Sequence, residues 1–180
     1  MELLPGERLD DLGRGGLKII QSEDGFAFGV DSVLLAHFVR VRPGDRVIDL
    51  GTGTTVIPLL LSAISGAKEI LGIEIQSHVA ERAARSVSHN CLGDRIGIRE
   101  MDLREAPAVL GHGGFDVVTV NPPYRTPGGG EVSPDPARAL ARHGISCTLD
   151  EVARAAAALV RFGGRVAMVH LPGRIPDVIT

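Results

Sequence analysis

Four residues with chemistry of their own, Asn121-Pro122-Pro123-Tyr124, follow directly after the apolar run Phe115–Val120. The side-chain oxygen of Asn121 and the backbone carbonyl of Pro122 can accept hydrogen bonds from both N–H groups of a planar amine, which localises the lone pair on its nitrogen. The two prolines stiffen the turn and preorganise both acceptors. Tyr124 can stack on a planar base, an interaction worth roughly 1–3 kcal/mol. We therefore expect an acceptor site for direct group transfer to an amine, without a metal or a general base.

A second motif, Asp49-Leu50-Gly51-Thr52-Gly53, ends an earlier apolar run, Arg46–Leu50. Glycines in such a turn let the backbone approach a ligand closely. Asp49 can orient the loop or meet an amino group of the ligand. The dinucleotide fingerprint GxGxxG is excluded, because Val56 takes the place of its third glycine. The loop instead resembles the shorter glycine loop of the class I methyltransferases, whose methyl donor is S-adenosylmethionine.

Acidic residues also follow two later strand-like runs. Glu74 lies at the end of residues 69–75, where its carboxylate can accept two charge-assisted hydrogen bonds from ribose hydroxyls. Asp102 follows residues 96–101 and could accept a hydrogen bond from an adenine amine, with Leu103 against the ring. The expected donor site comprises Asp49, Gly51, Thr52, Gly53, Glu74, Ile75, Asp102, Leu103 and Asn121.

The elements that must position these residues alternate along the chain. Strands are predicted at residues 46–50, 69–75, 96–101, 115–120 and 165–171, and helices at 55–65, 77–90, 105–110 and 148–162. This alternation predicts an α/β fold, a doubly wound, Rossmann-like parallel sheet with right-handed crossovers. Ligands in such sheets bind at the carboxyl ends of the strands, and all the candidate residues follow such ends.

Residues 1–45 are expected to form a lead-in to a methyltransferase domain at residues 46–180. Leu17–Gln21 and Phe26–Phe28 predict a small hairpin around a Glu23-Asp24-Gly25 turn. Asp31 is expected to cap a helix that runs through Val39.

Composition limits the function classes. A chain of 180 residues, 44% of them hydrophobic, fits one α/β domain with a substantial core. The formal net charge of −3 gives no global basic footprint for nucleic acid, which leaves local basic clusters. Two cysteines without a CxxC motif predict neither a metal site nor a disulfide framework. The longest apolar stretch, Val56–Ile64, is too short to cross a bilayer, so we expect a cytoplasmic protein with no membrane partner.

The chain resembles the Asn-Pro-Pro-Tyr group of class I methyltransferases and, within it, the family of tRNA1(Val) adenine N6-methyltransferases. The narrower resemblance spans nearly the whole chain and rests on Glu7–Leu12, Leu17–Gln21, Phe28–Leu35, Asn121–Tyr124 and Ala141-Arg142-His143. It implies that S-adenosylmethionine is the donor and that an adenine in RNA, beside the anticodon of a tRNA, is the acceptor. The expected substrate contacts are Pro123, Tyr124, Arg125, Arg142 and His143, the last three as a local phosphate-binding patch.

Three features depart from this family. Thr55 stands where many relatives have a further glycine, and Gly144 where they often have glutamate. The sequence also reaches Thr180 soon after the fifth predicted strand, whereas the class I fold normally adds two more. We therefore expect a sheet that lacks its last two strands. An unpaired edge invites association, so a homodimer through that edge is one alternative for an oligomeric state that stays open.

Two other functions fit parts of the pattern. The first is a protein glutamine methyltransferase. The side-chain amide nitrogen of glutamine is also a poor nucleophile, so Asn121 and Pro122 could activate it in the same way. Such enzymes usually carry a helical N-terminal domain, and only 45 residues precede the first strand of the sheet here. A non-catalytic module that binds S-adenosylmethionine or RNA is the third alternative.

Overall fold

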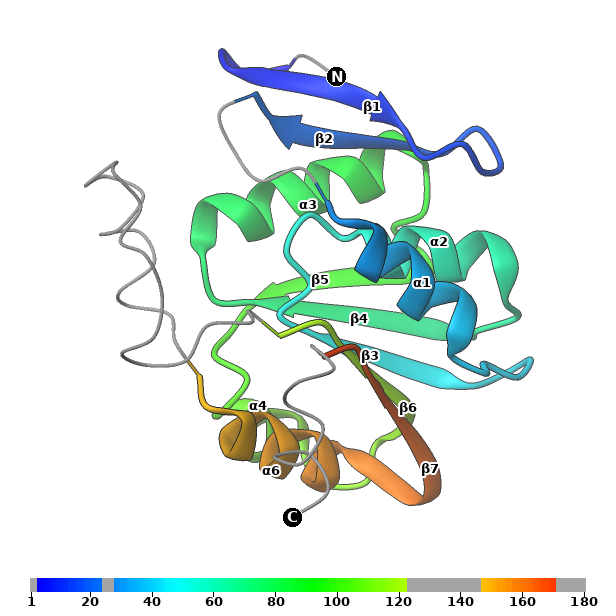
Figure 1. Cartoon of the computed structure of the whole chain (residues 1–180), viewed down its shortest axis with the longest axis vertical. Coiled ribbons are helices and arrows are strands. Elements are labelled where there is room, and N and C mark those ends of the chain that lie inside the picture. Colours follow the sequence, from blue (N-terminus) through cyan, green and yellow to red (C-terminus); the bar gives the residue numbers. More distant parts are fainter. Residues whose placement is uncertain (1–2, 24–27, 123–146, 171–180) are drawn as a thin grey trace.

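The computed structural model describes residues 3–23, 28–122 and 147–170, and its main feature is a parallel sheet (Figure 1). The strands of this sheet are β3 (Arg46–Leu50), β4 (Glu69–Glu74), β5 (Ile96–Glu100), β6 (Phe115–Val120) and β7 (Val160–Met168). Their order is β5-β4-β3-β6-β7, and all neighbours are parallel. From β3 the chain first adds strands on one side (β4, β5) and then returns to add strands on the other side (β6, β7). The order of strand addition thus reverses between β3 and β6, which confirms the doubly wound α/β fold predicted from the sequence.

Helices cover both faces of the sheet (Figure 1). One face carries α1 (Val30–Phe38), α2 (Val56–Ile64) and α3 (Ser77–His89), and the other carries α4 (Ala106–Leu110) and α6 (Leu149–Leu159). Val47 and Ile48 are fully buried and belong to different hydrophobic clusters, because successive side chains of a strand point to opposite faces. Strands buried on both faces explain the nearly continuous apolar runs of the sequence.

An antiparallel hairpin, β1 (Glu7–Asp11) and β2 (Lys18–Ser22), lies over α3 (Figure 1). The predicted hairpin of residues 17–21 with residues 26–28 missed the upstream strand β1, with which β2 pairs. Residues 26–27 lie outside the described residues, and Phe28 is not in a strand. The sequence of β1, Glu-Arg-Leu-Asp-Asp, is mostly charged and has little strand propensity, which is why its pattern concealed the strand.

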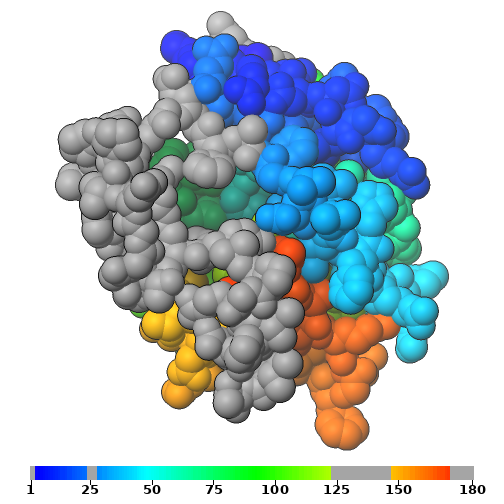
Figure 2. Space-filling model, viewed as in Figure 1, coloured from blue at the N-terminus to red at the C-terminus, as the bar shows by residue number. Residues whose placement is uncertain are grey.

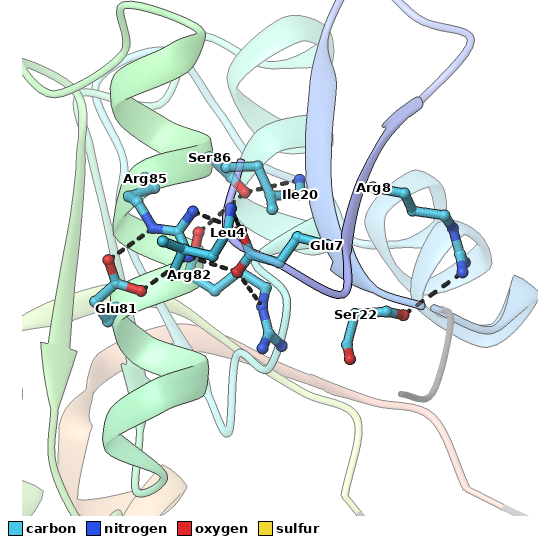
Figure 3. Close-up of polar contacts among 9 residues, drawn as sticks. All are labelled: Leu4, Glu7, Arg8, Ile20, Ser22, Glu81, Arg82, Arg85 and Ser86. Carbon is cyan, nitrogen blue, oxygen red and sulfur yellow. Dashed lines mark hydrogen bonds and ion pairs between the residues drawn. The ribbon is translucent and has the colours of Figure 1, made fainter. Parts of the chain in front are cut away.

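The Glu7 carboxylate fastens this hairpin to α3 (Figure 3). Only 4% of the side chain is exposed, and its oxygens accept hydrogen bonds from Arg85 at 2.5 and 2.7 Å and from Arg82 at 3.1 Å. The Arg85 guanidinium is the main cause that lowers the pKa of Glu7 to about 2. The backbone N–H of Ile20 also donates to Ser86 Oγ at 3.0 Å. The hairpin is therefore part of the packed body.

Two element details differ from the predictions. The N-cap of α1 is Gly29, without a side-chain cap, so the prediction that Asp31 caps this helix is wrong. Asp31 lies in the first turn, where a negative charge still favours the helix dipole. Helix α6 ends at Leu159 rather than 162, since Val160 already pairs with Phe115 ahead of a bulge.

The lead-in contributes to the same core as the sheet. Ile19 and Leu35 are buried in one cluster with Val47 and Leu59. No helix among the described residues is long and apolar enough to cross a membrane. Residues 171–180 lie outside the described residues, so the expectation that the sheet lacks its last two strands stays a prediction.

Candidate active site

The candidate residues meet at the carboxyl ends of three adjacent strands, β4, β3 and β6. Leu50 pairs with Ile73 on one side and with Val120 on the other. Glu74, Gly51 and Asn121 are the next residues along these strands, so they follow at the same edge of the sheet. This edge includes the switch point between β3 and β6, where open α/β sheets bind their ligands.

The loop from β3 into α2 contains three left-handed residues. The φ angles are 66° at Gly51, 54° at Gly53 and 66° at Thr55. A Cβ atom added at either glycine would meet no atom within 4 Å, so the loop offers open backbone to a ligand. Thr55 is fully buried, and a left-handed conformation is a genuine outlier for a β-branched residue. Thr55, which stands where many relatives have a glycine, therefore occupies a position whose backbone conformation suits glycine.

The Glu74 carboxylate holds this loop in place. Glu74 is 5% exposed, and its two oxygens accept hydrogen bonds from the backbone N–H groups of Gly53 and Gln76, each at 3.0 Å. Each carboxylate oxygen can accept a further hydrogen bond. The ribose contact predicted for Glu74 is therefore compatible with the hydrogen bonds that it already makes.

Asp49 lies buried next to the same loop, with 1% of the residue exposed. Its Oδ1 accepts a hydrogen bond of 2.7 Å from the hydroxyl of Thr119 on β6. Burial raises the pKa of Asp49 to about 6; the hydroxyls of Thr119 and Thr52 oppose this rise, and the charge of Glu74 adds to it. Asp49 Oδ2 and Thr52 Oγ1 are buried and make no hydrogen bond of normal geometry among the described residues, although the Thr52 hydroxyl lies close enough to Asp49 to affect its pKa. A buried carboxyl with so few hydrogen-bond partners favours a positive charge nearby.

Asp102, after β5, pairs with a neighbouring arginine. Arg104 Nε lies 3.0 and 2.9 Å from the two Asp102 oxygens, and the Arg104 hydrogen bonds lower the pKa of Asp102. Arg104 also reaches Glu151 of α6 at 3.6 Å. Leu103 is partly buried against the core on this face, and Ile75, after Glu74, is also partly buried. The adenine contact expected of Asp102 and Leu103 stays a prediction.

The acceptor motif begins with two described residues, the partly buried Asn121 and the buried Pro122. Asn121 Nδ2 donates a hydrogen bond of 3.0 Å to Ser32 Oγ in the first turn of α1. Because Nδ2 of the Asn121 amide points toward Ser32, Oδ1 points away from Ser32. The expected contacts of Pro123, Tyr124, Arg125, Arg142 and His143 lie outside the described residues and stay predictions.

Three partners of the site were not singled out from the sequence: Ser32, Gln76 and Thr119. Thr119 had a usable signal, because it is a polar residue in the otherwise buried apolar stretch Val117–Val120. Ser32 contacts a residue 89 positions away, and no local pattern indicates that contact. The Gln76 contact arises from the turn after β4 and involves mainly its backbone.

The site brings two acidic side chains beneath an open glycine loop, next to an asparagine amide. This arrangement suits a cationic ligand held beside a hydrogen-bonded planar group. Within residues 3–23, 28–122 and 147–170, no group of three or more His, Cys, Asp or Glu residues is arranged to hold a metal ion.

Comparison with known proteins identifies the family. The model of the Methyltransferase small domain family matches residues 20–170. The chain belongs to this family. The matched range includes α1, the glycine loop and the described part of the acceptor motif.

Curated relatives of this chain include tRNA1(Val) (adenine(37)-N6)-methyltransferases. The protein of Aeromonas salmonicida is 33% identical over 152 residues, which are 84% of this chain and 61% of the relative. The protein of Bacteroides thetaiotaomicron is 31% identical over 152 residues, 83% of this chain and 61% of the relative. The chain thus spans about three fifths of the length of these relatives.

Solved structures show the same fold as this chain. A predicted O-methyltransferase from Agrobacterium tumefaciens superposes with a TM-score of 0.64 and 23% identity, over 83% of this chain and 65% of that one. TrmN from Thermus thermophilus gives a TM-score of 0.59 and 21% identity, over 82% of this chain and 39% of that one. These likenesses concern the fold alone.

Proposed function

We propose that this protein transfers a methyl group from S-adenosylmethionine to the exocyclic N6 amine of an adenine in tRNA. The new N–C bond would form as the bond from the sulfonium to the methyl group breaks, with S-adenosylhomocysteine as the leaving group and the amine proton released to solvent. The observation that carries the proposal is the placement of the glycine loop and Asn121-Pro122 at the ends of adjacent strands, β3 and β6. The names of the curated relatives support adenine 37 of a tRNA as the target.

The donor side of the site would hold a positively charged ligand. S-adenosylmethionine, when bound, supplies a methyl group on a sulfonium cation. The Glu74 carboxylate accepts hydrogen bonds from the ribose hydroxyls, and Gly51 and Gly53 allow the backbone to approach the ligand. Asp49 and Glu74 together favour a cation at this edge of the sheet. Asp102 and Leu103 bind the adenine ring of the donor.

The acceptor side would activate and orient the amine. Asn121 Oδ1 accepts a hydrogen bond from one N–H group of the adenine amine, and the Pro122 carbonyl accepts from the other. Both hydrogen bonds localise the nitrogen lone pair and direct it at the methyl group. Tyr124 stacks on the base. Orientation of this kind supplies much of the rate in a direct displacement.

The proposed partner is RNA, with Arg125, Arg142 and His143 as phosphate contacts. Self-association through the outer edge of β7, which is a terminal strand of the described sheet, is the oligomeric alternative. Sedimentation velocity over a range of protein concentrations distinguishes a homodimer from a monomer.

Methyl transfer from labelled S-adenosylmethionine to unmodified total tRNA tests the proposal, with wild type and Asn121→Ala compared side by side. We expect label as N6-methyladenine with the wild type and loss of nearly all label with Asn121→Ala. Label in protein glutamine, with none in tRNA, would redirect the assignment to a glutamine methyltransferase. Donor binding without transfer to either acceptor would support a non-catalytic module.

A further inference from the structure

The amide of Asn121 is held by a helix from the other end of the chain. Asn121 Nδ2 donates to Ser32 Oγ at 3.0 Å, although the residues are 89 positions apart. Ser32 lies in the first turn of α1, where its backbone N–H donates to the Gly29 carbonyl at 3.2 Å. The hairpin and α1 lie next to each other on one face of the molecule (Figure 2).

The body of the protein fixes the position of Ser32. Leu35 and Ala36 of α1 are 3% and 1% exposed and belong to the main core. The chain that enters α1 is held by Gln21, a buried residue of β2 whose Oε1 accepts a hydrogen bond of 3.0 Å from the Phe28 N–H. The Ser32 hydroxyl is therefore a fixed point beside the acceptor motif.

A rigidly held hydroxyl beside Asn121 is important because the asparagine amide has an acceptor oxygen on one side and a donor nitrogen on the other. Its terminal torsion is broad and roughly twofold, so the side chain itself does not choose which corner faces a substrate. Only the oxygen can accept a hydrogen bond from an amine N–H, since the nitrogen is a donor. When the oxygen faces the substrate, the nitrogen faces Ser32, and both corners of the amide are satisfied together.

We propose that Ser32 is a positioning residue for methyl transfer, which fixes the place and plane of the Asn121 amide beside the substrate amine. This inference rests on the proposed function. A serine hydroxyl can accept or donate, so it fixes the place and plane of the amide, while the bound amine selects the orientation. Ser32 does not touch the reacting atoms, and its effect passes through Asn121 alone.

Kinetics of Ser32→Ala and Ser32→Thr test this role, with Ser88→Ala as the control. Ser88 is an exposed helical serine on α3, away from the site. For Ser32→Ala we expect kcat to fall about 10- to 100-fold, as for the loss of other orienting hydrogen bonds. We expect KM for tRNA and the Kd of S-adenosylmethionine from calorimetry to stay within about twofold. Ser32→Thr keeps the hydroxyl and should restore most of kcat.

A double-mutant cycle separates positioning from a general structural effect. Because Ser32 acts through Asn121, adding Ser32→Ala to Asn121→Ala should lower kcat no further. The inference is overturned if Ser32→Ala keeps wild-type kcat, if Ser32→Thr is impaired as severely as Ser32→Ala, or if the two losses multiply. A Ser32→Ala protein that loses donor binding or melts many degrees lower than Ser88→Ala also overturns it, because the role would then be structural.

One readout does not depend on activity. The two side-chain N–H resonances of Asn121 in a ¹⁵N NMR spectrum should shift in Ser32→Ala and stay in place in Ser88→Ala. Unchanged resonances in Ser32→Ala would overturn the inference directly. A wild type that methylates no tRNA would overturn the proposed function instead, and the NMR comparison would still decide whether Ser32 holds Asn121.

Discussion

At the scale of single residues, Asp49 connects the site to the stability of the fold. Its carboxyl is buried, and its pKa in the folded protein is about 6, above the ordinary value of 3.8. The folded state therefore binds the Asp49 proton more tightly than the unfolded state. The stability from this group is fully present below pH 3.8 and is lost as the pH rises through 6.

Asp49→Asn should remove this pH dependence. Between pH 5 and pH 8 the wild-type free energy of unfolding should fall by about 1 kcal/mol because of Asp49. The asparagine variant should lack that component, since its side chain does not titrate. Urea unfolding of both proteins at the two pH values measures the difference. Equal changes in wild type and variant would mean that the Asp49 carboxyl is already ionised at pH 5.

Thr55 is the second residue with a measurable consequence. It is fully buried in a left-handed conformation, and its Oγ1 has no hydrogen-bond partner among the described residues. Thr55→Gly relieves this strain, but it also removes the packing of the methyl group and increases the conformational entropy of the unfolded chain. We expect the relief of strain to be larger, so the variant should raise the free energy of unfolding by roughly 1 kcal/mol. Thr54→Gly is the matched control, because Thr54 has no positive φ and should lose stability. Chemical denaturation decides, and a Thr55→Gly protein as weak as Thr54→Gly would refute the strain.

At the scale of elements, the hairpin depends on a buried carboxylate. Glu7→Gln removes the charge that neutralises Arg82 and Arg85 on α3, so the free energy of unfolding should fall by about 2 kcal/mol. Glu81→Gln is the control, because Glu81 is 55% exposed and exposed pairs contribute about 0–1 kcal/mol. Thermal melts at pH 7 measure both. Equal losses in the two variants would show that the contact of Glu7 is no stronger than a surface pair.

The pH window of Glu7 differs from that of Asp49. The pKa of Glu7 is lowered to about 2 from 4.5, so its contribution is present above pH 4.5 and is lost as the pH falls through 2. The melting temperature of Glu7→Gln should therefore approach that of wild type in acid. A gap that persists at pH 2 would assign the effect to packing instead of charge.

Much of this fold could be predicted from local signals. The strands at 46–50 and 115–120 have the predicted bounds, because short apolar runs between turn residues are strong signals. The hairpin partner was missed, because four charged residues of β1 depend on tertiary contacts such as Glu7 with Arg85. The end of α6 was misplaced because Val160, Arg161 and Phe162 fit a helix locally, while pairing with Phe115 makes Val160 part of a strand.

The residues of the site could be predicted from the sequence, but the hydrogen bonds between them could not. Strand-end residues such as Glu74 and Asn121 follow from the rule that ligands bind at the carboxyl ends of parallel strands. The hydrogen bond from Thr119 to Asp49 depends on strand register, and the contact of Ser32 with Asn121 depends on how α1 packs. Neither register nor helix packing is contained in the local pattern of residues.

At the scale of the whole molecule, the charge balance bears on how tRNA would bind. Several arginines of the described residues are paired with acids, among them Arg46 with Glu69 and Arg161 with Asp116, and the formal net charge is −3. These pairs and the negative net charge favour a local basic patch over a broad basic surface. The proposed phosphate contacts on the segment after the acceptor motif become correspondingly important.

Arg125→Ala with Arg142→Ala should weaken tRNA binding with little effect on donor binding. Each lost phosphate contact should make the plot of log affinity against log salt less steep by about one. Arg154→Ala is the control, because Arg154 is an exposed residue of α6. Fluorescence anisotropy at several salt concentrations measures the slope. An unchanged slope in the double variant would place the tRNA elsewhere on the molecule.

We propose that donor binding depends mainly on Glu74, after β4, and that Asn121, after β6, mainly orients the acceptor amine although it also borders the donor. The most direct test compares Glu74→Ala and Asn121→Ala by calorimetric binding of S-adenosylmethionine and by single-turnover methylation of tRNA. We expect Glu74→Ala to weaken donor binding about 10-fold or more, and Asn121→Ala to keep donor binding within about threefold while transfer falls about 100-fold or more. Asn121→Ala that loses donor binding as Glu74→Ala does, or that methylates tRNA at the wild-type rate, would contradict the claim.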